Sequence, residues 1–216
     1  MNSIPAFLYE KILTFTLIFL VSLLFAIEGK AQVVFEKSYF FVGGSYSMYF
    51  PSEKNFYEIY EESFRYPSVF FGIGFDNFSL VAKYRQFKST GVSLVKNLSA
   101  KGYAEWNQEF YSAGIRIFNS NPVYVDICVV ETKVTEKIGT VKPNLTELAS
   151  VSTLKDQGMS FAVGVFFPII KKKIYLSADF DYTYLDHRVQ LNDYENKNIS
   201  LGGVSFSIGL VFGLEY

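Results

Sequence analysis

The sequence has little of what most enzymes and nucleic-acid-binding proteins depend on. Its 216 residues include one cysteine and one histidine, and the formal net charge is −1. The single cysteine, Cys128, excludes an intramolecular disulfide and a metal site built from several cysteines. A charge near zero offers no basic surface for phosphates, so we expect no nucleic-acid partner. No glycine-rich phosphate loop is present, and the sequence predicts neither a cofactor nor a bound metal.

Long hydrophobic runs are also scarce. The only one covers residues 12–27; Lys11 precedes it, and small residues lead to a candidate cleavage site after Ala31. This layout predicts a signal peptide over residues 1–31 and a mature domain over residues 32–216. The alternative is an uncleaved anchor helix, because about 17 apolar residues are the lower limit for crossing a bilayer. No other segment suits a membrane helix, so a mature chain in a membrane would have to cross it with strands.

Aromatic residues are abundant, with 23 Phe and 16 Tyr, and the end of the chain shows how they are arranged. Glycine, serine and other mostly small or polar residues alternate there with large apolar ones, namely Val204, Phe206, Ile208, Leu210, Phe212, Leu214 and Tyr216. A period of two indicates a β-strand with two unlike faces. A face of small residues opposite a bulky one is typical of a strand between lipid and a crowded barrel lumen.

The same period predicts eight strands, at residues 39–50, 68–75, 78–87, 109–118, 123–132, 158–167, 174–185 and 201–216. The connections between them are alternately long and short, the longest being the expected loop at residues 133–156. This is typical of an all-β, eight-stranded antiparallel up-and-down transmembrane β-barrel with short periplasmic turns and long loops outside. An even number of strands places both mature termini on the periplasmic side.

One alternative concerns the number of strands. Residues 92–98 and 151–154 are apolar enough to form extra strands or to extend the third and sixth strands beyond the membrane. A ten-stranded barrel of this kind would have two very tight outer loops, so we rank it second.

Charged residues fix which face of each strand points outward. Seven of them share the face of the glycines and serines, and we expect a lumen ion-pair network of Lys83, Arg85, Arg116, Asp126, Asp179, Asp181 and Glu215. A shift by one residue would turn all of them to lipid, where one Lys or Arg costs about 2–4 kcal/mol at the midplane. We therefore predict a lumen plugged by ion pairs. A soluble barrel would instead put these charges outside and the aromatic face in the lumen.

Aromatic residues near strand ends are expected to form girdles at the two membrane interfaces. These are Tyr49, Tyr66, Trp106, Tyr111, Tyr184 and Tyr216.

The signal peptide, the eight alternating strands and the terminal Phe212-Gly-Leu-Glu-Tyr216 resemble the small OmpA/OmpX-type outer-membrane β-barrel superfamily, a porin-like group. The resemblance covers essentially the whole mature chain and rests on pattern. It implies an outer-membrane location in a Gram-negative-type bacterium, with outer-membrane lipid as a partner. It also implies insertion by the barrel-assembly machinery, which would read the terminal strand at Phe212, Leu214 and Tyr216. A terminal Tyr departs from the commoner Phe.

The loop from Pro51 to Arg65 is the candidate binding segment. It carries rings among acidic residues, and the candidate contacts for an unknown extracellular ligand are Phe56, Tyr57, Tyr60 and Phe64. The alternative is that these rings pack on neighbouring loops or extend the barrel above the membrane.

The sequence predicts no catalytic residues. His187 lies beside Asp186, but a catalytic triad needs a third convergent group, and none is recognisable. We therefore expect a structural, binding or adhesion protein and not an enzyme. The alternatives are a narrow pore for passive diffusion and a lipid-modifying enzyme at the barrel rim.

Overall fold

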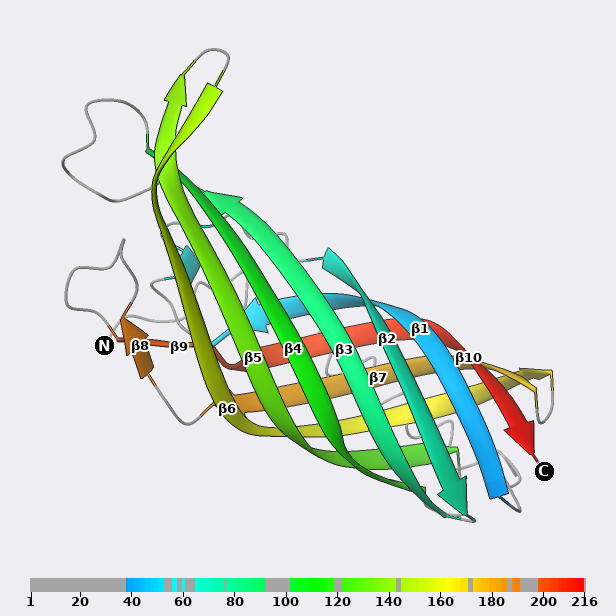
Figure 1. Ribbon diagram of the computed structural model, residues 1–216. Coiled ribbons are helices and arrows are strands. Elements are labelled where there is room, and N and C mark those ends of the chain that lie inside the picture. The colour runs from blue at the N-terminus through cyan, green and yellow to red at the C-terminus, as the bar shows by residue number, and fades with distance from the viewer. Residues whose placement is uncertain are drawn as a thin grey trace, which may run out of the picture.

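Alternating apolar residues close the chain into one antiparallel barrel, seen in the computed structural model (Figure 1). The structure describes residues 38–52, 56–57, 60, 65–75, 77–91, 102–118, 122–142, 145–170, 173–185, 188–190 and 198–215. The barrel strands are β1 (Ser38–Pro51), β2 (Arg65–Phe75), β3 (Phe78–Gly91), β4 (Gly102–Phe118), β5 (Val123–Lys142), β6 (Leu145–Ile170), β7 (Ile174–Leu185) and β10 (Gly203–Glu215). The predicted eight-stranded barrel is confirmed. The predicted signal peptide lies outside the described residues.

Closure depends on the first and last barrel strands. β1 pairs with β10 from Tyr39 opposite Glu215 to Pro51 opposite Gly203, so neither strand is left with an open edge. In lipid such an edge would leave backbone groups without hydrogen-bond partners. Two short strands, β8 (Arg188–Gln190) and β9 (Asn198–Ser200), form a separate hairpin.

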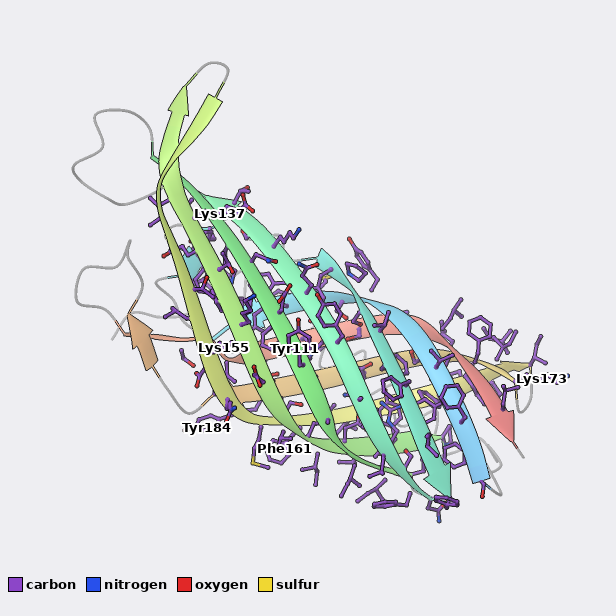
Figure 2. All side chains as sticks on the ribbon, viewed as in Figure 1. Tyr111, Lys137, Lys155, Phe161, Lys173 and Tyr184 are labelled. Carbon is purple, nitrogen blue, oxygen red and sulfur yellow. The ribbon has the colours of Figure 1, made fainter. Side chains whose placement is uncertain are left out.

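The two faces of each strand differ as predicted. In β2 the exposed side chains are Pro67, Val69, Phe71, Ile73 and Phe75, and the residues between them are buried. Figure 2 shows the same outer wall, with Phe161 on its lower part and Lys137 and Lys155 nearer the long β5–β6 hairpin. The wall therefore has an apolar band that gives way to a polar surface on one side.

The prediction of a loop at residues 133–156 is wrong. β5 runs to Lys142 and β6 begins at Leu145, so most of this segment is a long hairpin that projects beyond the rest of the barrel (Figure 1). The alternative in which residues 151–154 extend the sixth strand is confirmed, whereas residues 92–98 lie outside the described part. The prediction stopped early because outward residues turn polar after Val129, although the pairing continues.

No helix among the described residues has the length and apolar character needed to span a bilayer.

Candidate functional site

The centre of the lumen holds a layer of buried charges around Asp126. Arg116 Nε donates a hydrogen bond to Asp126 Oδ1 at 2.7 Å, and Arg116 Nη2 donates to Oδ2 at 2.9 Å. Lys83 Nζ also pairs with Asp126 Oδ2. Arg116 and Asp126 are direct cross-strand partners on β4 and β5, which gives the guanidinium its two-pronged approach.

A second group of charges lies around Asp181. Arg85 Nη1 is 3.0 Å from Asp181 Oδ1, and Lys83 Nζ is 3.5 Å from Asp181 Oδ2. Arg85 also donates hydrogen bonds to the hydroxyls of Ser205, at 3.1 Å, and Thr183, at 3.3 Å. Lys83 therefore joins the Asp126 and Asp181 groups into one network.

Asp179 and Glu215 differ from the other five residues that were expected in this network. Asp179 is half-buried and accepts a 3.4 Å hydrogen bond from the Tyr124 hydroxyl. Glu215 closes the β1–β10 pairing through its backbone, and its side chain lies outside the described part. The other five, together with Asp179, form a network of three cations and three carboxylates. Such balance matters because removing one partner would leave an uncompensated buried charge.

Aromatic rings fill the lumen on the side of the short turns. This turn-side cluster consists of Tyr39, Phe41, Phe70, Val81, Phe118, Tyr124, Cys128, Phe166, Tyr175 and Val211. Arg116 lies over the Tyr124 ring, with its guanidinium carbon 3.7 Å from the ring centroid. Phe70 lies opposite Gly43, where a Cβ would overlap the Phe70 ring, so the glycine makes room for the aromatic side chain.

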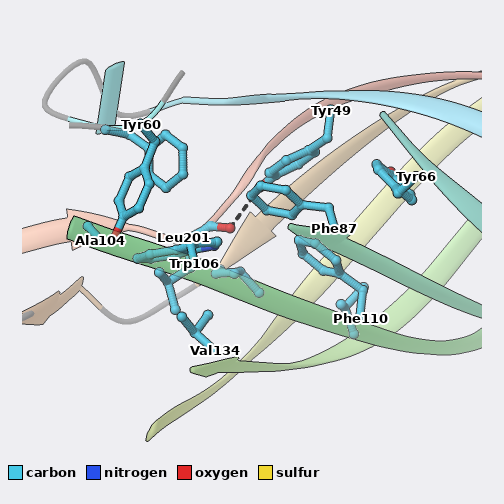
Figure 3. Close-up of a cluster of buried hydrophobic side chains, with 12 residues drawn as sticks. Tyr49, Tyr60, Tyr66, Phe87, Ala104, Trp106, Phe110, Val134 and Leu201 are labelled. Carbon is cyan, nitrogen blue, oxygen red and sulfur yellow. Dashed lines mark hydrogen bonds between the residues drawn. The ribbon is translucent and has the colours of Figure 1, made fainter. Parts of the chain in front are cut away.

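A second aromatic group, the extension-side cluster, closes the other end (Figure 3). Its members are Tyr49, Phe56, Tyr60, Tyr66, Phe87, Ala104, Trp106, Phe110, Val130, Val134, Leu185 and Leu201. Tyr49 donates a 2.8 Å hydrogen bond to the Leu201 carbonyl, and Tyr60 donates one of the same length to Glu136 Oε1. The charged layer thus lies between two aromatic clusters, and neither cluster was predicted.

The 51–65 loop packs inward at the residues that the structure describes. Phe56 and Tyr60 are only 1% and 2% exposed, stack on each other at 4.6 Å, and contact the Trp106 ring edge-on. Tyr57 is half-buried, and Phe64 lies outside the described residues. The prediction that Phe56 and Tyr60 belong to an exposed contact surface is therefore wrong. Their apolar rings are buried in the barrel mouth and are removed from water.

The expected interfacial girdles are only partly correct. Tyr49, Tyr66 and Trp106 are buried in the lumen because they occupy inward positions on their strands. Tyr111 and Tyr184 are 48% and 53% exposed on the outer wall, as expected. Tyr216 lies outside the described residues.

The free space among the charges is small. A cavity of about 10 Å³ touches Lys83, Arg85, Arg116, Asp179 and Asp181. This volume has room for about one water molecule. The charged layer of the lumen is therefore filled with side chains, as expected for an eight-stranded barrel.

The remaining predicted sites lie outside the described residues or on the outer face of β10. His187 lies outside the described residues, and among those described no group of three or more His, Cys, Asp and Glu side chains is arranged to hold a metal ion. Phe212 and Leu214 of the expected assembly signal are exposed on the outer face of β10.

Comparison with known proteins identifies the fold and no closer relationship. No protein-family model and no curated protein sequence matches the chain. Its structure is similar to the outer membrane protein OprG of Pseudomonas aeruginosa, with a TM-score of 0.58 and 11% identity over 87% of this chain and 99% of that one. It is also similar to a major outer membrane protein of Thermus thermophilus, with a TM-score of 0.51 and 10% identity over 82% of this chain and 99% of that one.

The attachment invasion locus protein Ail of Yersinia pestis gives a TM-score of 0.50 and 9% identity, over 83% of this chain and 99% of that one. Likeness at such low identity concerns the fold alone. The chain therefore has the eight-stranded β-barrel fold of the small OmpA/OmpX-type outer-membrane proteins.

Proposed function

We propose that this protein resides in the outer membrane of a Gram-negative-type bacterium as a non-enzymatic barrel with a plugged lumen. The observation that carries the proposal is the outer wall. Large apolar side chains are exposed on every barrel strand, including Phe71, Leu80, Val129 and Phe161, while Asp126 and Arg116 are buried inside. In water this would expose an apolar band around the barrel, whereas in a bilayer the same band meets hydrocarbon.

The proposed orientation places the short turns and both mature termini in the periplasm. The β5–β6 hairpin then projects outside the cell, where its polar outer face suits water. Export by the predicted signal peptide and insertion by the barrel-assembly machinery, through Phe212, Leu214 and Tyr216, complete this proposal.

We propose that the outer extension, which comprises residues 102–109 of β4, 133–142 of β5 and 145–155 of β6, is the binding or adhesive part of the molecule. The 51–65 loop is less suited to this role because Phe56 and Tyr60 belong to the extension-side cluster. In the test, Asn-Gly replaces residues 139–149, so that the pair Ile138 and Ser150 is closed by a two-residue turn. We expect the variant to insert normally, judged by heat-modifiable migration of the membrane fraction, and to lose attachment of expressing cells to host cells or matrix proteins. Unchanged attachment would refute the assignment to this hairpin.

A narrow pore is the second candidate, and the packed lumen argues against it. We expect no steady conductance in single-channel recordings from lipid bilayers, because about 10 Å³ of free space among the charges cannot hold a column of water. A steady single-channel current would establish the pore instead.

The rim enzyme is the least favoured candidate. His187→Ala is expected to leave lipid A unchanged in mass spectra of whole membranes, since no triad around this residue is recognisable in the sequence. A lipid modification that depends on His187 would overturn the non-enzymatic assignment.

A further inference from the structure

The outer wall is hollowed where β2 to β6 lie side by side. A groove of about 600 Å³ lies over Ala82 and Ala113, which are cross-strand partners with small outward side chains. Larger side chains border it, namely Val69, Phe71, Tyr84, Tyr111 and Val129. The rings of Tyr84 and Tyr111 are 5.2 Å apart. The volume lies within the range of small-molecule sites, and the lining is mostly apolar.

Two lysines lie just beyond the polar end of this groove. Lys133 on β5 is directly opposite Lys155 on β6, and both side chains are exposed. Each lysine is two residues along its strand from a groove residue, Glu131 on β5 and Gln157 on β6. Like charges directly opposite on neighbouring strands repel each other. An anion between them would remove this repulsion.

The neighbouring acids engage this pair only weakly, through one long and exposed ion pair between Lys155 and Glu131. Glu109, the other cross-strand partner of Lys133, accepts a 3.2 Å hydrogen bond from the Tyr111 hydroxyl. Glu131 makes only a 3.8 Å contact with Lys155. Within the described part of the chain, no carboxylate lies at ion-pair distance from Lys133. Two ammonium groups next to an apolar groove match a ligand with a phosphate at one end and a hydrocarbon chain at the other.

We infer that this wall holds one phosphate-bearing membrane lipid. An acyl chain lies in the groove over Ala82 and Ala113, and the phosphate lies between Lys133 and Lys155. The inference rests on the proposed function, because it requires the apolar band to be in a bilayer. It goes further by assigning a fixed lipid site to one part of the wall.

Native mass spectrometry of the full-length mature barrel tests this inference. The protein is released from detergent micelles that contain phosphatidylglycerol, phosphatidylethanolamine or diacylglycerol. We expect one bound lipid with either phospholipid and little with diacylglycerol, which has the same chains but no phosphate. The double variant Lys133→Glu/Lys155→Glu should reduce phospholipid retention about tenfold, because both cationic contacts become repulsive.

Two further variants separate the phosphate contact from the groove. Lys88→Glu reverses an exposed lysine on the β3 wall, outside the groove lining, and should leave retention unchanged. Ala113→Phe fills the groove and should reduce retention of both phospholipids. Heat-modifiable migration is recorded for every variant, so failure of the barrel to insert is distinguished from failure to hold the lipid.

Equal retention of diacylglycerol, or an equal loss in Lys88→Glu, would overturn the phosphate site. A dimer that excludes lipid and is lost in Ala113→Phe would overturn it in favour of a second copy of the chain.

Discussion

The apolar band and the outer extension are two parts of the same strands. Their outward-facing residues are apolar in the band and mostly polar in the extension. Along β5 the outward residues Val125, Ile127 and Val129 are exposed and apolar, and Glu131 and Lys133 follow them. The inward face shows no such change, because apolar and polar side chains are buried in both parts, with Tyr124 and Asp126 in the band and Val134 and Glu136 in the extension. Backbone pairing therefore continues unchanged where the outward residues change from apolar to polar.

Loss of a buried charge in the band should lower the free energy of unfolding most. Asp126→Ala removes the shared partner of Arg116 and Lys83, and should lower the free energy of unfolding by about 3–5 kcal/mol. The matched change in the extension is Glu105→Ala, whose 3.3 Å contact with Lys137 is partly exposed and should be worth less than about 1 kcal/mol. Urea unfolding in lipid vesicles measures both. Similar losses of unfolding free energy in the two variants would show that the ion pairs of the band contribute no more to stability than the ion pair of the extension.

Charge on the outer wall gives the next largest effect. Leu80→Arg places a guanidinium in the apolar band, where we expect a loss of about 2–4 kcal/mol. Thr153→Arg is the control, because its exposed side chain lies on the extension and the change should stay within about 0.5 kcal/mol. Vesicle unfolding curves compare the two, and a Leu80→Arg variant as stable as the control would place the band in water.

Adjacent glycines on β1 test the packing of the lumen. A Cβ at the inward Gly43 would overlap the Phe70 ring, so Gly43→Ala should cost about 1–3 kcal/mol. Outward Gly44 has its nearest neighbouring atom 3.8 Å from the added Cβ, so Gly44→Ala should be close to neutral. Adding Phe70→Leu to Gly43→Ala should recover part of the loss in a double-mutant cycle. Independent, additive effects of the two changes would contradict the ring–glycine pairing.

The smallest effect is expected at the boundary between the regions. Tyr111→Phe removes the 3.2 Å hydrogen bond to Glu109 and leaves the exposed ring in place. We expect a change of about 0.5 kcal/mol in the unfolding free energy, since the bond is open to solvent. A loss as large as that of Leu80→Arg would mean that Tyr111 lies within the apolar band and that the boundary is farther toward the extension.

The sequence predicted the band well because large apolar residues alternate there with small or polar ones. The strands, their phase and the inward positions of residues such as Asp126 and Arg116 all follow from that contrast. The β5–β6 extension was missed because both faces carry polar residues there, including Thr132 and Lys133, so the period of two loses its signal. Pairing with the neighbouring strand, which the sequence does not display, continues nonetheless.

The aromatic clusters were missed for a different reason. Rings were assigned to lipid and its interfaces, whereas an inward ring such as Phe70 or Phe41 is accommodated by a glycine opposite it, Gly43 or Gly72. Such pairs provide a signal that becomes usable once the register is known. The inward packing of Phe56 had no comparable signal, because it depends on how a loop folds over Trp106.

Fluorescence quenching by brominated lipids distinguishes an outer wall in contact with lipid from an inner wall that is shielded from it. The native Trp106 is 1% exposed inside the barrel, whereas Ile127 projects outward from the band. We expect weak quenching of Trp106 in the unaltered protein and strong quenching of the new indole in Ile127→Trp made on a Trp106→Phe background. Strong quenching of Trp106 together with none at position 127 would contradict it.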